Sequence, residues 1–135
     1  MATYLDNLGE NQFVVVRDIN HPRQELLIDS NSLTPYKKYV ALLTQSGIDA
    51  PTAIVLENTI GDIVWTYSSL GEYLGILTNA FTEDKTFLFA YILPTSVIKI
   101  ERNNVNQINV GTTDNLGAKT NGLLNNTSIE IRVYN

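Results

Sequence analysis

Residues 111–120 (GTTDNLGAKT) are the part of the chain closest in residue types to a phosphate-binding loop. Such a loop has four residues between two glycines and a glycine directly before its lysine, so that backbone N–H groups and the ammonium group meet the phosphates. Here five residues separate Gly111 from Gly117. Ala118 lies between Gly117 and Lys119, and no helical pattern follows. We therefore interpret the stretch as a polar loop and expect no nucleotide or other cofactor.

The groups that could perform acid–base or nucleophilic chemistry are few and scattered. The single histidine, His21, precedes Pro22 in the least regular part of the chain, which does not suit a rigid Ser/His/Asp relay. Glu83 and Asp84 are adjacent, so their side chains diverge, whereas a glycosidase needs two carboxyl groups that face each other across a cleft. The chain contains no cysteine and no calcium-loop pattern. We therefore predict no catalytic residues, no metal site and no enzymatic activity.

Aromatic residues on three expected strands allow two interpretations. Because they alternate with Ile, Val and Leu, they are typical of a hydrophobic core, but on an exposed surface they would line a sugar-binding face. We expect the first interpretation for Trp65, Phe87 and Phe89. We expect three tyrosines to be half-exposed at an edge or an interface, namely Tyr67, Tyr73 and Tyr91.

The composition narrows the class of protein. The chain has 135 residues, which suits one domain, and only 17% of them are charged. The net charge is −5 and the only adjacent basic pair is Lys37–Lys38, so we expect no nucleic-acid partner. No apolar run approaches about 18 residues, so we expect no membrane span. The N-terminus lacks the basic and apolar segments of a secretory signal, and we expect synthesis in a cytoplasm.

Apolar residues recur with a period of two, which is the spacing of β-strands. Turn residues separate the apolar runs, and runs begin about every 10–12 residues between Tyr39 and Ser96. This rhythm predicts an all-β fold, either an antiparallel β-sandwich or a partly open barrel. One run, 86–93 (TFLFAYIL), is apolar on both faces, so we expect it in the middle of the fold. The expected strands are 12–17, 25–28, 39–44, 52–56, 62–68, 72–78, 86–93, 96–102 and 127–134.

The expected core consists of the apolar residues that alternate inward on these strands. If Phe89 is buried, Phe89→Ala should lower the free energy of unfolding by about 3–5 kcal/mol. The predicted core residues are Val64 or Trp65, Leu74 or Ile76, Phe87, Phe89, Ile98, Ile100, Ile129, Ile131 and Val133.

The N-terminal region, Met1–Thr34, departs from the regular pattern. It is more polar and has too few regularly spaced apolar residues to pack alone. We therefore expect an extended arm or edge segment over residues 1–34, followed by a β-sandwich domain over residues 35–135. Phe13–Val16 (FVVV) would be an aggregation hazard if it were exposed, so we expect another chain to stabilise the arm.

A second irregular region, Asn103–Asn126, has few large apolar side chains and eight asparagines. We expect it to be a long loop or a pair of short edge strands, which are common places for contacts. Asparagine and threonine donate and accept hydrogen bonds without a charge that must be desolvated, which suits a wet interface. The interface residues that we predict are Phe13, Val14, Val15, Val16, Asn109, Asn115 and Asn121.

The central segment Tyr39–Phe81 contains a distinctive series of short features: LTQSG, DAP, VLENT-G, VWTY and G-Y-G-LT-AF. In this series it resembles a small β-rich module of tailed phages, notably phages of Bacteroidota and marine bacteria. The segment covers about a third of the chain. The resemblance implies a virion or tail-associated protein and identifies no active-site residue.

Two functions follow as expectations. The first is a bacteriophage structural protein at the capsid surface, neck, tail or a fibre of the virion, synthesised in the host cytoplasm. It would act as a homo-oligomer, with copies of itself and other virion proteins as partners. The alternative is a carbohydrate-binding or receptor-binding β-sandwich module, which uses the aromatic residues and the asparagine-rich loops to bind a glycan.

Overall fold

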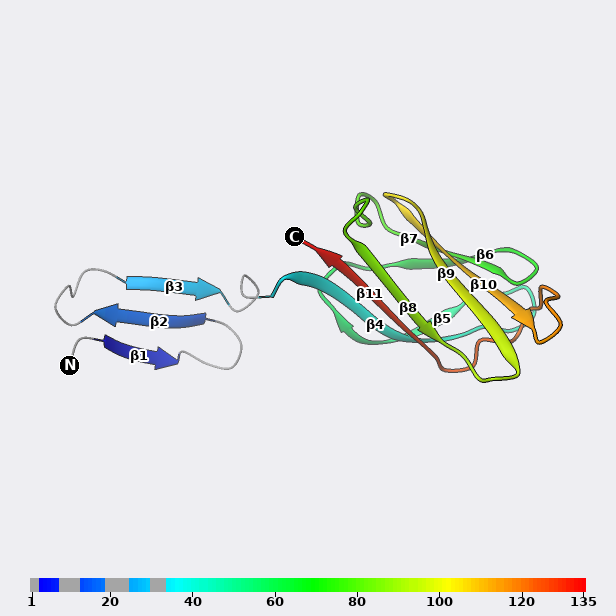
Figure 1. Ribbon diagram of the computed structural model, residues 1–135, viewed down its shortest axis with the longest axis horizontal. Helices are drawn as coiled ribbons and strands as arrows, with labels where there is room; N and C mark the ends of the chain where they lie inside the picture. Colours follow the sequence, from blue (N-terminus) through cyan, green and yellow to red (C-terminus); the bar gives the residue numbers. More distant parts are fainter. Residues whose placement is uncertain (1–2, 8–12, 19–24, 30–33) are drawn as a thin grey trace. The chain divides into compact units, whose positions relative to one another are not determined.

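The computed structural model describes residues 3–7, 13–18, 25–29 and 34–135. The chain divides into two compact units, Met1–Pro35 and Tyr36–Asn135 (Figure 1). His21 lies outside the described residues.

The first unit contains a three-stranded antiparallel sheet in the order β1-β2-β3. Its strands are β1 (Thr3–Asn7), β2 (Phe13–Asp18) and β3 (Glu25–Asp29). The central strand, β2, pairs with β1 from Val14 to Asp18 and with β3 from Phe13 to Arg17. The β-branched run of β2 favours a strand, as the sequence predicts.

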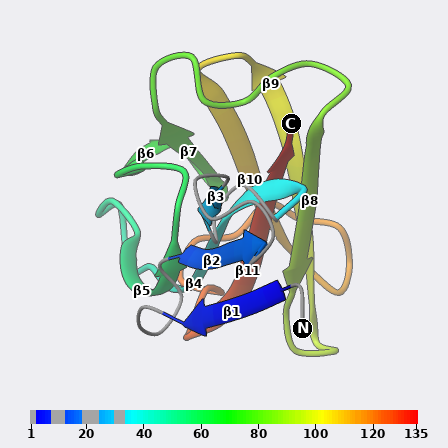
Figure 2. The ribbon, with the colours of Figure 1, turned by 90° about the vertical axis from the view of Figure 1, so that its left-hand side faces the viewer.

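The second unit contains two four-stranded sheets, and every strand pairing in them is antiparallel. The strand orders are β5-β4-β11-β8 and β6-β7-β10-β9, which confirms the predicted all-β sandwich. In Figure 2, β5 and β6 lie along one side of this unit, while β8 and β9 lie along the other. The strands are β4 (Tyr36–Thr44), β5 (Thr52–Asn58), β6 (Val64–Ser69), β7 (Glu72–Ile76), β8 (Thr86–Tyr91), β9 (Ser96–Asn104), β10 (Gln107–Asp114) and β11 (Thr127–Tyr134).

The core of the second unit lies between the two sheets and follows the alternation of the strands. In β4, every second residue from Tyr39 to Leu43 is buried, and the residues between them face outward. Ile129 and Ile131 of β11 are buried as predicted, and the predicted Ile98, Ile100 and Val133 pack against the core. The buried apolar residues are Tyr39, Ala41, Leu43, Ile63, Trp65, Tyr73, Phe81, Ile108, Val110, Leu124, Ile129 and Ile131.

The prediction that Phe87 and Phe89 belong to the core is wrong. The strand that contains them, β8, is an edge strand and not a central one. Phe87 is 48% exposed and Phe89 is 51% exposed, because these residues are on the outer side of the sheet. The smaller residues Leu88 and Ala90 pack against the core instead. Both faces of the strand are apolar, so the sequence pattern alone does not distinguish the inner face from the outer one.

Two further core predictions need correction. Of the two alternatives Val64 and Trp65, Trp65 is the buried residue, and Val64 is exposed. In β7, Leu74 and Ile76 are only half-buried on the outer side, and the fully buried side chain is Tyr73. Tyr73 was therefore wrongly expected at an edge or an interface.

The asparagine-rich region, Asn103–Asn126, is not a long loop or a pair of edge strands. It contains all of β10, which lies between β7 and β9 in the middle of its sheet. Ile108, Val110 and Thr112 of this strand are fully buried. Their alternation with polar neighbours is a period-two signal, and the asparagines around it obscured the pattern.

Buried Gln45 connects the loops at one end of the sandwich. Its Nε2 donates hydrogen bonds to backbone carbonyl oxygens within residues 46–49, at 2.8–3.2 Å. Its Oε1 accepts hydrogen bonds from the Tyr73 hydroxyl at 2.8 Å and from the Gly122 N–H at 2.7 Å. Gln45 is only 4% exposed, and these partners satisfy its amide.

Candidate interaction surfaces

One outer face of the sandwich is unusually apolar, and we call it the aromatic face. It consists of the outward side chains of the β5-β4-β11-β8 sheet. Phe87, Phe89 and Tyr91 follow one another along the edge strand β8, and each is about half exposed. Ile54, on the opposite edge strand β5, is 57% exposed. The outward residues that define the aromatic face are Tyr36, Lys38, Val40, Leu42, Thr44, Thr52, Ile54, Glu57, Phe87, Phe89, Tyr91, Ser128, Glu130, Arg132 and Tyr134.

The charged groups of the aromatic face are already paired within it. Arg132 Nε donates a hydrogen bond of 2.7 Å to the Glu130 carboxylate, which raises the pKa of the guanidinium group. The guanidinium also lies over the rings of Tyr36 and Phe87, 4.6 and 5.7 Å from their centroids. These are cation–π distances. A second ion pair joins Lys38 to Glu57 of β5.

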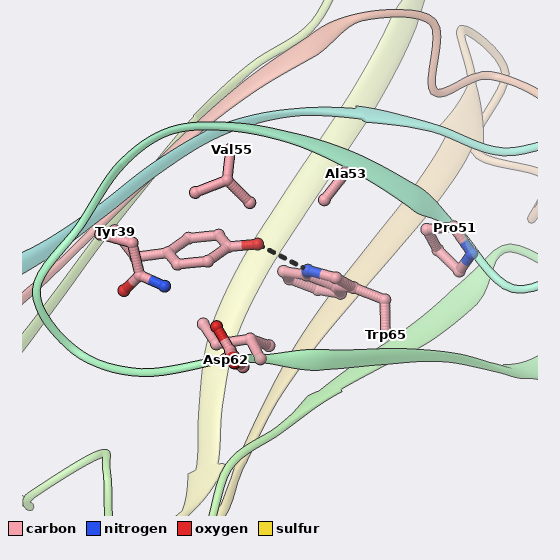
Figure 3. Close-up of a pocket in the computed structure, with 8 residues that line it drawn as sticks. Tyr39, Pro51, Ala53, Val55, Asp62 and Trp65 are labelled. Carbon is pink, nitrogen blue, oxygen red and sulfur yellow. Dashed lines mark hydrogen bonds between the residues drawn. The ribbon is translucent and has the colours of Figure 1, made fainter.

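A narrow slot opens between the edge strands β5 and β6 (Figure 3). It has a volume of about 280 Å³. Trp65 and Tyr39 line it and are joined by a hydrogen bond of 3.2 Å, which the indole Nε1 donates to the tyrosine oxygen. Burial raises the pKa of Tyr39. Val55 and Asp62 line the slot from the two strand edges and are more exposed than the aromatic pair.

The outer face of the β6-β7-β10-β9 sheet has a different character, and we call it the polar face. The Glu72 carboxylate accepts hydrogen bonds of 2.7 Å from Lys119 Nζ and from Asn109 Nδ2. Partial burial of Glu72 opposes ionisation, but these two donors outweigh it and lower the pKa of Glu72. A salt bridge of 2.8 Å joins Lys99 to Glu101 on β9. A hollow of about 390 Å³ lies over this cluster, and the charged groups around it bind one another.

The three asparagines predicted at an interface have different positions. Asn109 lies on the polar face and is bonded to Glu72. Asn121 is half-buried and accepts a hydrogen bond of 2.7 Å from the Gly71 N–H, which fastens the connection before β11 to the β6–β7 turn. Asn115 is exposed in that connection. Asn109 and Asn121 therefore bond to adjacent residues, Glu72 and Gly71, and the role of the three asparagines at an interface stays a prediction.

The other predicted interface residues belong to the first unit. The backbone of Phe13–Val16 lies in β2 of the first unit. The loop after β10 is closed by Asp114, whose carboxylate accepts hydrogen bonds from the N–H groups of Leu116 and Ala118. These N–H groups are therefore already occupied. The described residues contain no group of three or more His, Asp or Glu side chains placed to hold a metal ion.

The aromatic face was not recognised from the sequence because Phe87 and Phe89 were expected in the core, whereas they lie on the outer side of the sheet. The slot was not recognised because it depends on the proximity of two distant residues, Tyr39 and Trp65. In the part of the chain that the structure describes, no helix is long and apolar enough to cross a membrane.

The chain matches no protein-family model, no curated protein and no solved structure.

Proposed function

We propose that this chain is a non-enzymatic structural protein of a bacteriophage virion, which acts by assembling with copies of itself and with other virion proteins. The observation behind the proposal is the aromatic face, where a row of three half-exposed aromatic residues shares one sheet surface with exposed Ile54. Exposed aromatic side chains in a row on one sheet surface are typical of protein interfaces. The assignment to a phage rests on the resemblance of Tyr39–Phe81 to the phage module.

The charges of the aromatic face favour a second copy of the chain as the occupant. The face contains two ion pairs, Glu130–Arg132 and Lys38–Glu57, so its charges cancel although the whole chain has a net charge of −5. Two copies related by a twofold axis would each present an acid and a base on β11, which allows the pairs to interact across the interface. A strongly charged partner would leave one of these charges unmatched.

The proposal is tested by the mass of the full chain in solution, measured by analytical ultracentrifugation. We expect a dimer or a larger oligomer, and we expect the double variant Phe87→Ser, Phe89→Ser to be a monomer with an unchanged melting temperature. The matched control changes two exposed valines of the polar sheet, Val64→Ser and Val97→Ser, and should leave the oligomer intact. A wild-type monomer at about 100 µM would contradict assembly through this face, since specific interfaces usually bind more tightly.

The virion assignment has a separate test. Peptides from this chain should be found by mass spectrometry in purified particles, at an amount comparable to other structural proteins. An antibody against residues 36–135 should label intact particles if the protein is on their surface. If the chain is absent from purified particles, the virion role is contradicted. An oligomer measured in solution would then need another explanation.

The N-terminal unit supports the expectation of an arm that another chain stabilises. Its described strands form one small sheet, β1-β2-β3, and a small sheet without a second layer is rarely stable by itself. We propose that a neighbouring chain supplies this layer. Deletion of residues 1–34 should leave residues 35–135 folded and weaken the assembly. Unfolding of the truncated protein would show that the first unit is needed within its own chain.

A second candidate function, glycan binding, is favoured by one observation. The aromatic row on β8 is exposed rather than buried, and exposed rings offer a flat apolar surface to a sugar ring. A saturable signal on a glycan array, lost in the Phe87→Ser, Phe89→Ser variant, would support this function. Loss of the oligomer without any glycan signal would favour assembly.

A further inference from the structure

The four edge strands of the sandwich differ in how their open sides are protected. The strands β5, β6, β8 and β9 each have a neighbour in the sheet on one side only. An open edge presents unpaired backbone groups to other chains, and proteins usually protect it with bulges, charged side chains or proline. The pairings of β5, β6 and β9 each contain a register shift, and β5 and β9 also have charged side chains in ion pairs. These three edges are therefore protected.

The fourth edge strand, β8, has none of these features. Its pairing with β11 is regular over all six residues, from Thr86 to Tyr91. Its sequence, TFLFAY, contains no charged residue and no proline. A regular, apolar edge of this kind is a template for the addition of another strand.

The free backbone groups of β8 can be identified from one hydrogen bond at its start. The Tyr134 N–H donates to the Lys85 carbonyl oxygen at 2.8 Å. Hydrogen-bonded pairs alternate along an antiparallel ladder, so every second residue after Lys85 bonds to β11. The residues between them, Thr86, Leu88 and Ala90, therefore have their N–H and C=O groups on the open side. Among the described residues, no other group bonds to these backbone atoms.

The strand that matches this edge is β8 of a second copy. When two β8 strands run antiparallel with Leu88 opposite Leu88, the free groups of Leu88 form one hydrogen-bonded pair, and those of Thr86 pair with those of Ala90. On the outer side, Phe87 of each copy then lies opposite Phe89 of the other. Cross-strand aromatic pairs are favourable, and this register places no charged residue of β8 opposite another. The other edges of the sandwich, with their register shifts, offer no equally regular partner.

We propose that β8 pairs with β8 of a second copy about a twofold axis, so that the two β5-β4-β11-β8 sheets form one continuous sheet of eight strands. The inference rests on the proposed self-assembly of the chain and adds a second interface to it. The aromatic face is covered when one sheet packs on another, whereas the edge is closed by backbone hydrogen bonds. With two twofold interfaces on each chain, the smallest closed assembly is a tetramer.

Two alanine-to-proline substitutions on opposite edges of the same sheet test the pairing. Ala90→Pro removes an N–H on the open side of β8, and its ring obstructs a partner strand. Ala53→Pro is the matched control on β5. The Thr59 N–H donates to the Lys38 carbonyl oxygen, and the alternation along β4 from this bond leaves the Ala53 N–H on the open side as well. Both alanines are partly buried against the core, so we expect the two variants to have similar melting temperatures.

Analytical ultracentrifugation of the full chain measures the result. At about 100 µM, we expect a tetramer for wild type and for Ala53→Pro. We expect a dimer for Ala90→Pro, because the aromatic face can still pack when the edge is closed to a partner.

Amide hydrogen exchange of the wild-type oligomer tests the pairing without any substitution, and so does not depend on the folding of Ala90→Pro. After correction for intrinsic rates, the Leu88 and Ala90 amides should exchange about 100-fold more slowly than the Ala53 amide, which stays on an open edge.

The outcomes separate the edge from the aromatic face. If wild type assembles and Ala90→Pro has the same mass, or if the Leu88 amide exchanges as fast as the Ala53 amide, the edge pairing is wrong and the proposed assembly remains. An equal loss of mass in both proline variants also contradicts the pairing, since Ala53 lies on a different edge. A wild-type dimer that becomes a monomer in Ala90→Pro would support the edge and contradict packing through the aromatic face. A wild-type monomer would contradict both.

Discussion

The two outer faces of the sandwich differ although they come from the same architecture. Each belongs to a four-stranded antiparallel sheet whose other side covers the core. On the polar face, the Glu72 carboxylate is bonded to the Asn109 amide and to the Lys119 ammonium group. On the aromatic face, Phe87, Phe89 and Tyr91 line the edge strand and remain about half exposed. Both faces pair their charged groups within the chain, and the aromatic face additionally exposes a row of large aromatic side chains to water.

This difference bears on which surface water solvates well and which would gain from being covered. Water solvates charged and amide groups well, so the polar face needs no partner. Removing apolar surface from water is favourable by roughly 25 cal/mol for each Å². Covering the exposed aromatic side chains is therefore favourable. The Glu130–Arg132 pair prevents the aromatic face from being uniformly apolar, which favours one partner orientation over others.

The largest expected effect separates the inner from the outer side of the same sheet. Ile131→Ala should lower the free energy of unfolding by about 3–4 kcal/mol, because Ile131 is fully buried and its loss leaves a cavity. Phe89→Ala, on the neighbouring strand, should lower it by less than about 1 kcal/mol. Urea denaturation of both variants, at a protein concentration at which sedimentation shows each to be a monomer, checks this. Equal losses would mean that the aromatic face is covered within the chain.

The sequence predicts the strands well because their signal is local. Each of the predicted strands from Tyr39 onward appears in the structure, with its ends shifted by a few residues. Inward positions are also predictable where apolar and polar residues alternate, as in Ile129 and Ile131. The order of strands in the sheets is not local. Phe89 was therefore wrongly predicted in the core, because the sequence of one strand does not show which other strands become its neighbours in the sheet.

The candidate sites depend still more on the pairing of distant residues. The slot joins Tyr39 to Trp65, and the Gln45 amide joins Tyr73 to Gly122. No spacing in the sequence announces these contacts, because each depends on which sheet the strands enter. The aromatic row on β8 was visible as a pattern, and only its exposure was not. If a strand that is apolar on both faces were treated as a possible edge strand, the exposure of this row could have been predicted.

The second effect tests the charge pattern of the aromatic face. Arg132→Glu leaves Glu130 and residue 132 both acidic, so two copies would bury like charges against each other. We expect association to weaken about 100-fold, or about 2.7 kcal/mol, as measured by sedimentation at several concentrations. Reversing the pair with Glu130→Arg in addition should restore most of the affinity.

The polar face supplies a matched control for this charge reversal. Lys99 and Glu101 form an ion pair two residues apart on β9, with the same spacing as the pair on β11. Lys99→Glu should leave association unchanged within about twofold, because this face is expected to remain in water. Equal weakening by both substitutions would mean that net charge, and not the aromatic face, controls assembly.

The third effect concerns the acid side of the pH–stability profile and sharpens the description of the polar face. The pKa of Glu72 is lower in the folded chain than its ordinary value of 4.5, because Lys119 and Asn109 bond its carboxylate. Its ionised form therefore stabilises the fold above pH 4.5, and this stabilisation is lost as the pH falls through the lowered pKa.

Glu72→Gln tests this assignment by removing the ionisable group at nearly constant shape. At pH 7 the variant should be less stable by about 1 kcal/mol, since it loses charge-assisted hydrogen bonds. The difference from wild type should shrink as the pH is lowered below 4.5, as measured by thermal unfolding. Glu101→Gln, an exposed acid on the same face, should change stability by less than about 0.5 kcal/mol. A difference that stays constant with pH would contradict the role of the Glu72 charge.

The smallest expected effect separates two asparagines of the same region by their partners. Asn109 donates a 2.7 Å hydrogen bond to Glu72, so Asn109→Ala leaves that carboxylate with one donor fewer and should cost about 1 kcal/mol. Asn115 is exposed in the connection after β10, and Asn115→Ala should change the free energy of unfolding by less than about 0.5 kcal/mol. Because neither belongs to the aromatic face, neither should change the oligomer. A loss of assembly in Asn115→Ala alone would restore this connection as the contact surface, since the substitution acts on no bond within the chain.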